Sequence, residues 1–200
     1  MSRLASNTLR IGDIAPAFAL STFDGRFVQL GEVLSRGPVL LLFAPGTWSP
    51  YTRRWLEDLE AAAERFRSVG VAVLVVVAQD AAGAKRSLFR QRPWFPVLTD
   101  ARRNVARDYG VYRALSLDGI GVTCPAAFLI DGSGAIRFAY VGRNDGDVPE
   151  AEVLLNLASW LTFAEGSGRV SAAFPDGDEI WLDENQVFGV GRGKGDPVDS

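Results

Sequence analysis

The chain of 200 residues contains no histidine and only one cysteine, Cys124. Without histidine it lacks the usual general base, proton shuttle and ligand of zinc or haem. This absence excludes the serine–histidine–aspartate and cysteine–histidine types of catalysis. A single cysteine also excludes a disulfide within the chain.

Long apolar runs and clusters of basic residues are also missing. No run approaches the ~18 apolar residues of a membrane span, and the first residues lack the apolar stretch of a secretory signal. We therefore predict a cytoplasmic protein that does not bind membranes. The net charge of −3, without basic clusters, argues against nucleic acid as a partner.

Acidic residues with the spacing of a calcium loop are absent too, so we predict no metal and no cofactor. Carboxylate-only sites for calcium or magnesium stay open as a class. The nearest candidates, Asp176, Asp178 and Glu179, surround Gly177. A turn explains these residues equally well.

The residues that are present alternate between strand and helix patterns. Continuous apolar segments at 39–43 and 71–77 are typical of strands buried on both faces. Between them, residues 49–68 carry apolar side chains at spacings of three and four, which predicts a helix. The remaining pattern predicts a hairpin at 18–30, strands at 95–98, 126–130 and 135–141, and helices at 81–91, 102–109 and 149–163. Together they predict an α/β fold, a mixed sheet with helices on both faces.

The composition changes after residue 163, where glycines interrupt short apolar stretches. We predict one domain over residues 1–163, a small C-terminal β extension over 164–190 and a disordered tail over 191–200. The extension is expected to contain short strands at 170–174, 179–182 and 186–190. Three roles stay open for it: covering a sheet edge, reaching a second subunit, or lying over a cleft.

The junction between the first buried strand and the first long helix is the most informative segment. Ser49 is well placed as the N-cap of the helix and Pro50 as its first residue. Thiol enzymes place cysteine at such a junction, because the amide groups and dipole of the helix stabilise a thiolate. Here the two candidate positions are Ser49 and Thr52. Their hydroxyls do not ionise near neutral pH and cannot form sulfenic acid or a disulfide.

The order of these segments resembles the peroxiredoxins, the AhpC/TSA or redoxin branch of the thioredoxin-like superfamily. The resemblance covers roughly residues 9–162, and it rests on landmarks at 9–20, 39–43, 45–52, 98–111 and 125–132. It implies a thioredoxin-like, peroxiredoxin-type fold, to which the C-terminal β extension is added.

The resemblance also identifies what the site has lost. Residues 45–52 align on the active-site pattern Pro-x-x-x-Thr/Ser-x-x-Cys, in which Pro45 and Ser49 fit and Thr52 takes the position of the peroxide-attacking cysteine. The segment also resembles a Trp-Cys-Pro-Tyr-Cys variant, with Ser49 and Thr52 in place of both cysteines. Pro125 stands where peroxiredoxins usually have an arginine, and it resembles the cis-proline of thioredoxins.

By the same resemblance, Cys124 immediately precedes the cis-proline and faces Ser49 and Thr52 across a cleft. Two interpretations stay open. Cys124 is either a small buried apolar residue, or a relocated redox or ligand-binding thiol that the helix dipole or a nearby arginine activates.

The residues around Ser49 and Thr52 carry similar alternatives. Ser49 and Thr52 either serve the helix or remain as parts of a ligand pocket, where Thr52 would donate a hydrogen bond to an anion. Trp48 and Tyr51 either stack on a ligand or partner, or close the loop over the core. The arginines that would line an anion-binding cleft, or else lie solvated on the surface, are Arg53, Arg54 and Arg113.

These observations support two hypotheses for function and one for assembly. The favoured one is a divergent redoxin that lacks the peroxidatic cysteine and binds a partner or small ligand at the former redox cleft. The alternative is a thiol-dependent oxidoreductase or antioxidant that uses Cys124 beside Pro125. The third is a structural role through a homodimer, a common assembly among the peroxiredoxins that the chain resembles, with the extension at the interface.

Overall fold

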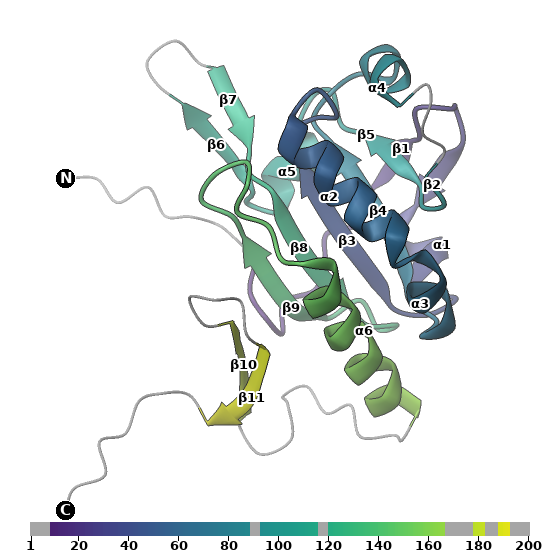
Figure 1. Cartoon of the computed structure of the whole chain (residues 1–200), viewed down its shortest axis with the longest axis vertical. Helices are drawn as coiled ribbons and strands as arrows, with labels where there is room; N and C mark the ends of the chain where they lie inside the picture. Colours follow the sequence, from purple (N-terminus) through teal and green to yellow (C-terminus); the bar gives the residue numbers. More distant parts are fainter. Residues whose placement is uncertain (1–8, 89–92, 116–119, 167–177, 183–187, 193–200) are drawn as a thin grey trace, which may run out of the picture.

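A five-stranded sheet forms the centre of the molecule (Figure 1). β3 (Val39–Ala44) is its middle strand; β4 (Ala72–Val77) and then β5 (Val97–Thr99) lie parallel to it on one side. On the other side, β8 (Ala126–Ile130) runs antiparallel to β3, and β9 (Ile136–Val141) runs antiparallel to β8. This computed structural model describes residues 9–88, 93–115, 120–166, 178–182 and 188–192.

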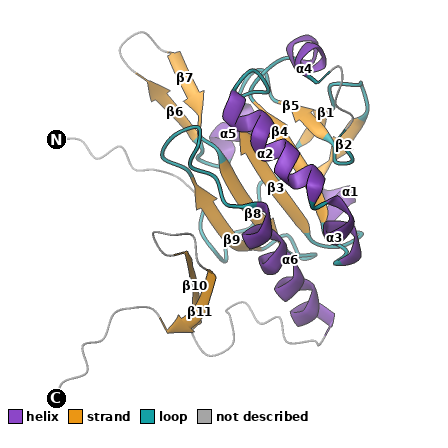
Figure 2. Ribbon diagram, viewed as in Figure 1, coloured by secondary structure: helices purple, strands orange, loops and turns teal. Residues whose placement is uncertain are grey.

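Helices cover both faces of this sheet because its middle strand is apolar on both. Leu40 and Leu42 of β3 belong to a core cluster with residues of α2, α3 and α6, whereas Leu41 and Phe43 belong to a second cluster with residues of α1 and α5. Figure 2 shows α2 and α6 side by side across one face. The helices are α1 (Leu30–Leu34), α2 (Pro50–Ala61), α3 (Ala63–Ser68), α4 (Ala81–Ser87), α5 (Asn104–Asp108) and α6 (Ala151–Gly166). The predicted α/β fold with helices on both faces is confirmed.

The helix predicted over 49–68 is interrupted at Ala62, which separates α2 from α3. The amide of Ala62 donates to the carbonyl of Leu59, three residues back rather than four. Such a bond tightens the last turn of a helix and ends its regular pattern. Apolar spacing alone does not reveal this break, because Leu59 and Phe66 face the same core on either side of it.

The sequence analysis missed one helix and one pair of strands, whereas the structure confirms the predicted N-terminal hairpin. It predicted neither α1 nor the antiparallel pair β6 (Tyr112–Leu115) and β7 (Ile120–Thr123). The predicted N-terminal hairpin is present as β1 (Ala19–Ser21) and β2 (Phe27–Gln29). Gly25 lies in its turn with φ +90°, a conformation that favours glycine.

The C-terminal segment contains an antiparallel pair, β10 (Asp178–Leu182) and β11 (Phe188–Arg192). The strand expected at 170–174 lies outside the described residues. β11 continues to Arg192, so the boundary predicted between the extension and a tail at 190/191 falls inside a strand. The division into domain, extension and tail otherwise stays a prediction. Within the part of the chain that the structure describes, no helix is long and apolar enough to cross a membrane.

Candidate functional site

The loop from β3 into α2 has the capped geometry that the sequence predicts. Ser49 has extended backbone angles, and its Oγ accepts a hydrogen bond from the amide of Thr52 at 3.5 Å. Pro50 is the first helical residue. The Ser49 and Thr52 residues are only 1% and 2% exposed. Both hydroxyls are therefore inside the helix start rather than on an open surface.

Gln79, just after β4, fixes this loop from the side. Its Oε1 accepts the amide of Thr47 at 2.8 Å, and its Nε2 donates to the Thr47 hydroxyl at 2.8 Å. A Cβ at Gly46 would lie 2.6 Å from Gln79 Oε1 and 2.3 Å from Trp48 Nε1, so a larger residue there would displace the Gln79 amide or the Trp48 ring. The sequence analysis missed Gln79; its position directly after a buried strand was the available signal.

A pocket of about 700 Å³ opens beside the loop. Five predicted site residues line it together: Trp48, Tyr51, Arg113, Cys124 and Pro125. Trp48 and Tyr51 are 61% and 60% exposed, so large apolar rings face water at its edge. We call this pocket the cleft, and its lining is completed by Val122, Arg143, Asn144, Asp145 and Gly146.

The other predicted site residues do not line the cleft. Pro45, Ser49 and Thr52 are buried. Arg53 instead holds the loop, since its Nη1 donates to the backbone oxygens of Thr47 at 3.3 Å and Trp48 at 2.8 Å. Arg54 is exposed and is not among the lining residues either.

The wall formed by residues 142–148 was not predicted as part of the site. Asp147 organises it: its carboxylate accepts the Arg143 amide at 2.8 Å, Arg143 Nε at 3.1 Å and the Tyr140 hydroxyl. Gly146 packs on the Tyr51 ring, where a Cβ would lie 3.2 Å from Cδ1. The turn residues of 142–147 signalled a loop, but not that it would meet Tyr51.

The pKa values of this wall follow from the same contacts. Burial raises the pKa of Tyr140 to about 12, and the hydrogen bond to Asp147 adds to the effect. Burial also opposes ionisation of Asp147, but hydrogen bonds from Tyr140 and Arg143 outweigh it and lower the pKa of that carboxyl. Asp147 therefore stays ionised and keeps the wall in place at neutral pH.

Cys124 lines the cleft but is only 6% exposed. Burial raises the pKa of its thiol; Arg113 acts in the opposite direction, and Asp145 raises the pKa further. The net effect is a thiol that is less ionised at neutral pH than an ordinary one. It is therefore a weaker nucleophile than the activated cysteines of thiol enzymes.

The predicted cis bond before Pro125 is wrong. No described residue has a cis peptide bond, so the bond from Cys124 to Pro125 is trans. Backbone hydrogen bonds hold both residues: the Cys124 amide donates to the Val111 carbonyl, and the Pro125 carbonyl accepts from the amide of Gly142. The trans form is also the intrinsically preferred one for a bond before proline.

The sheet order, the helices on both faces and the capped loop after β3 define a thioredoxin-like protein of the peroxiredoxin type. The AhpC/TSA family model matches residues 11–139. The chain belongs to the AhpC/TSA family.

Curated relatives agree with this assignment. The chain is 27% identical to the chloroplastic peroxiredoxin Q of Oryza sativa subsp. japonica over 160 residues, which are 79% of this chain and 71% of the relative. It is 31% identical to the thiol:disulfide interchange protein DsbE of Escherichia coli (strain K12) over 150 residues, 72% of this chain and 71% of that one.

Solved structures show the same fold. The peroxidoxin BcpB of Mycobacterium tuberculosis superposes with a TM-score of 0.67 at 22% identity, covering 78% of this chain and 97% of that one. Peroxiredoxin 6 of Arenicola marina gives a TM-score of 0.70 at 16% identity over 78% and 75% of the two chains.

Proposed function

We propose that this redoxin binds a partner or small ligand at the cleft and does not reduce peroxide at the position of Thr52. The observation that carries the proposal is the cleft itself, where exposed aromatic rings and Arg113 border about 700 Å³ of open space. Aromatic rings and arginine are the residues that contribute most to binding at such surfaces. Thr52, at the family's cysteine position, offers no thiolate.

The alternative, a thiol-dependent oxidoreductase that uses Cys124, has one observation in its favour, because Cys124 borders the same cleft as Arg113. The raised pKa of its thiol leaves less of the reactive thiolate at neutral pH and therefore favours the binding function over the thiol-dependent one. The two functions are separated by measuring hydroperoxide reduction with dithiothreitol as the reductant. We expect the native chain and Cys124→Ser to match the rate without protein. Turnover that disappears in Cys124→Ser would establish the alternative.

Binding at the cleft is tested with a library of small aromatic and carboxylate fragments, followed by NMR on the labelled protein. We expect hits to shift the indole resonance of Trp48, and Trp48→Ala to weaken them about tenfold or more, as expected for an aromatic hot spot. Arg86→Gln is the matched control, because Arg86 is exposed on α4 and does not line the cleft. Hits that bind Trp48→Ala as well as the native chain would contradict the proposal.

Two further properties remain part of the proposal. The cytoplasmic location is checked by fractionation of the producing cells. The homodimer is checked by the mass of the protein in solution.

A further inference from the structure

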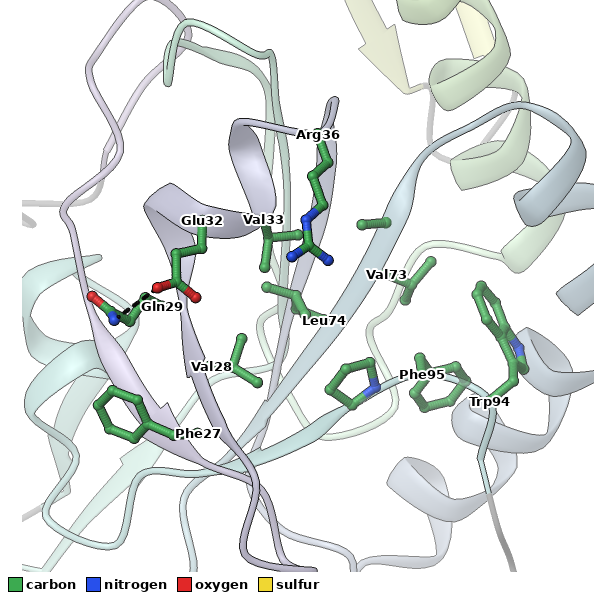
Figure 3. Close-up of a pocket in the computed structure, with 12 residues that line it drawn as sticks. Phe27, Val28, Gln29, Glu32, Val33, Arg36, Val73, Leu74, Trp94 and Phe95 are labelled. Atoms are coloured by element: carbon green, nitrogen blue, oxygen red, sulfur yellow. Dashed lines mark hydrogen bonds between the residues drawn. The ribbon is translucent and has the colours of Figure 1, made fainter.

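A second pocket lies away from the cleft and shares no lining residue with it. Its volume is about 380 Å³, within the range of small-molecule sites. It lies between the segment that contains β2 and α1 and the edge formed by the start of β4 and the residues before β5 (Figure 3). We call it the β2–α1 pocket.

Apolar side chains make the floor of the β2–α1 pocket. Val28 and Val33 lie beside Leu74, against whose core cluster they pack, and Val73, Trp94 and Phe95 lie on the other side (Figure 3). Phe27 lies at the opposite side and is 64% exposed. An apolar body in this space would be removed from water and would cover exposed ring surface, which favours binding.

One cation points into this apolar space. The guanidinium of Arg36 is directed between Val33 and Val73 in Figure 3. It has no ion-pair or hydrogen-bond partner among the residues that the structure describes. The acidic residue at the pocket, Glu32, instead accepts a hydrogen bond from Gln29 Nε2 at 3.1 Å. Arg36 is therefore free to receive an anionic group.

We propose that the β2–α1 pocket binds a small monocarboxylic acid with an apolar body, such as a medium-chain fatty acid. The carboxylate pairs with Arg36, whose forked N–H groups match two carboxylate oxygens. The chain lies on the valines and Leu74. This site is independent of the cleft and of the function proposed there.

The test is calorimetric titration of the native protein with sodium octanoate. Arg36→Gln keeps a polar, though shorter, side chain and removes the charge, and we expect it to weaken binding about tenfold, as for the loss of a charge-assisted hydrogen bond. Arg86→Gln is the matched control and should bind like the native chain. Octanamide, which has the same chain without the charge, should bind the native protein about as weakly as octanoate binds Arg36→Gln.

Two further variants test the chemical class of the ligand and the position of its binding site. Glu32→Gln should bind octanoate as well as or better than the native chain, because a like charge is removed. Weaker binding of octanoate by Glu32→Gln would overturn the monocarboxylate assignment. Arg113→Gln in the cleft should leave octanoate binding unchanged. Equal binding by Arg36→Gln and the native chain would overturn the site.

Discussion

Cys124 is the residue whose chemistry the fold controls most directly. Its raised pKa results first from burial, while Arg113 lowers and Asp145 raises it. We expect iodoacetamide to alkylate the folded protein slowly at pH 7 and faster only above pH 9, since the thiolate is the reacting form. Arg113→Gln should slow alkylation at pH 8, and Asp145→Asn should accelerate it.

The control for this experiment is the same set of proteins in concentrated urea, where all three should react at one rate. Rapid alkylation of the folded native chain at pH 7 would contradict the prediction. It would also favour the thiol-dependent function over the binding function.

Asp131 and Arg137 form a buried ion pair, with Nη2 2.6 Å from Oδ2. Burial pushes the pKa of Asp131 up, but hydrogen bonds from Ser133, Arg137 and Ala135 outweigh it, so the pKa lies below 3.8. The stabilisation of the folded state by this pair is therefore complete above the ordinary pKa of an aspartate, and it is lost as the pH falls through the lowered pKa of Asp131. We expect Asp131→Asn to lower the free energy of unfolding by about 3 kcal/mol at pH 6, because Arg137 loses its buried carboxylate partner.

Urea unfolding at pH 6 and pH 3 checks this prediction, and the difference between Asp131→Asn and the native chain should shrink at pH 3. Glu64→Gln is the control, since it breaks an exposed pair with Arg67. Such a pair contributes little, about 0–1 kcal/mol. If the difference in unfolding free energy between Asp131→Asn and the native chain grew as the pH fell, the prediction would be contradicted, because protonation of Asp131 removes the ion pair.

At the scale of elements, the loop 142–148 depends on a close approach that only glycine allows. A Cβ at Gly142 would lie 2.1 Å from the backbone oxygen of Asp147. We expect Gly142→Ala to displace the wall of the cleft and to cost about 1–3 kcal/mol in unfolding free energy, as overpacking does. The measurement is urea unfolding combined with NMR shifts of Tyr51, which touches Gly146.

Gly31→Ala is the matched control for Gly142→Ala, because no atom lies within 4 Å of a Cβ there. Gly31 is inside α1, where alanine is expected to stabilise by about 0.5–1 kcal/mol. If Gly142→Ala left both the stability and the Tyr51 resonances unchanged, the loop would not depend on this contact.

The elements that the sequence predicts are those with a strong pattern of their own. Residues 39–43 and 71–77 are apolar throughout, and both are central strands. The short elements α1 and β6–β7 carry too few residues for a period to show. The break at Ala62 depends on one backbone hydrogen bond, which leaves no mark on apolar spacing.

At the scale of the molecule, the site was predictable only where family resemblance carried it. The resemblance places Cys124 across a cleft from Ser49 and Thr52, whereas the pocket in the structure is lined by Cys124 together with Trp48 and Tyr51. It also suggested a cis bond before Pro125, which is wrong. The wall at 142–148 and the partner Gln79 depend on contacts between distant segments, which no local pattern encodes.

The redoxin fold is predicted not to need the C-terminal extension. Among the residues whose burial the structure describes, the apolar core runs from Ala15 to Ala164. A chain that ends at Gly166 should therefore have a free energy of unfolding within about 1 kcal/mol of that of the full chain. The slope of this free energy with urea concentration should be similar too. Light scattering on the two chains tests the homodimer at the same time, because an interface made by the extension would give twice the chain mass only for the full protein. A truncated chain that unfolds at much lower urea would place part of the core beyond Gly166.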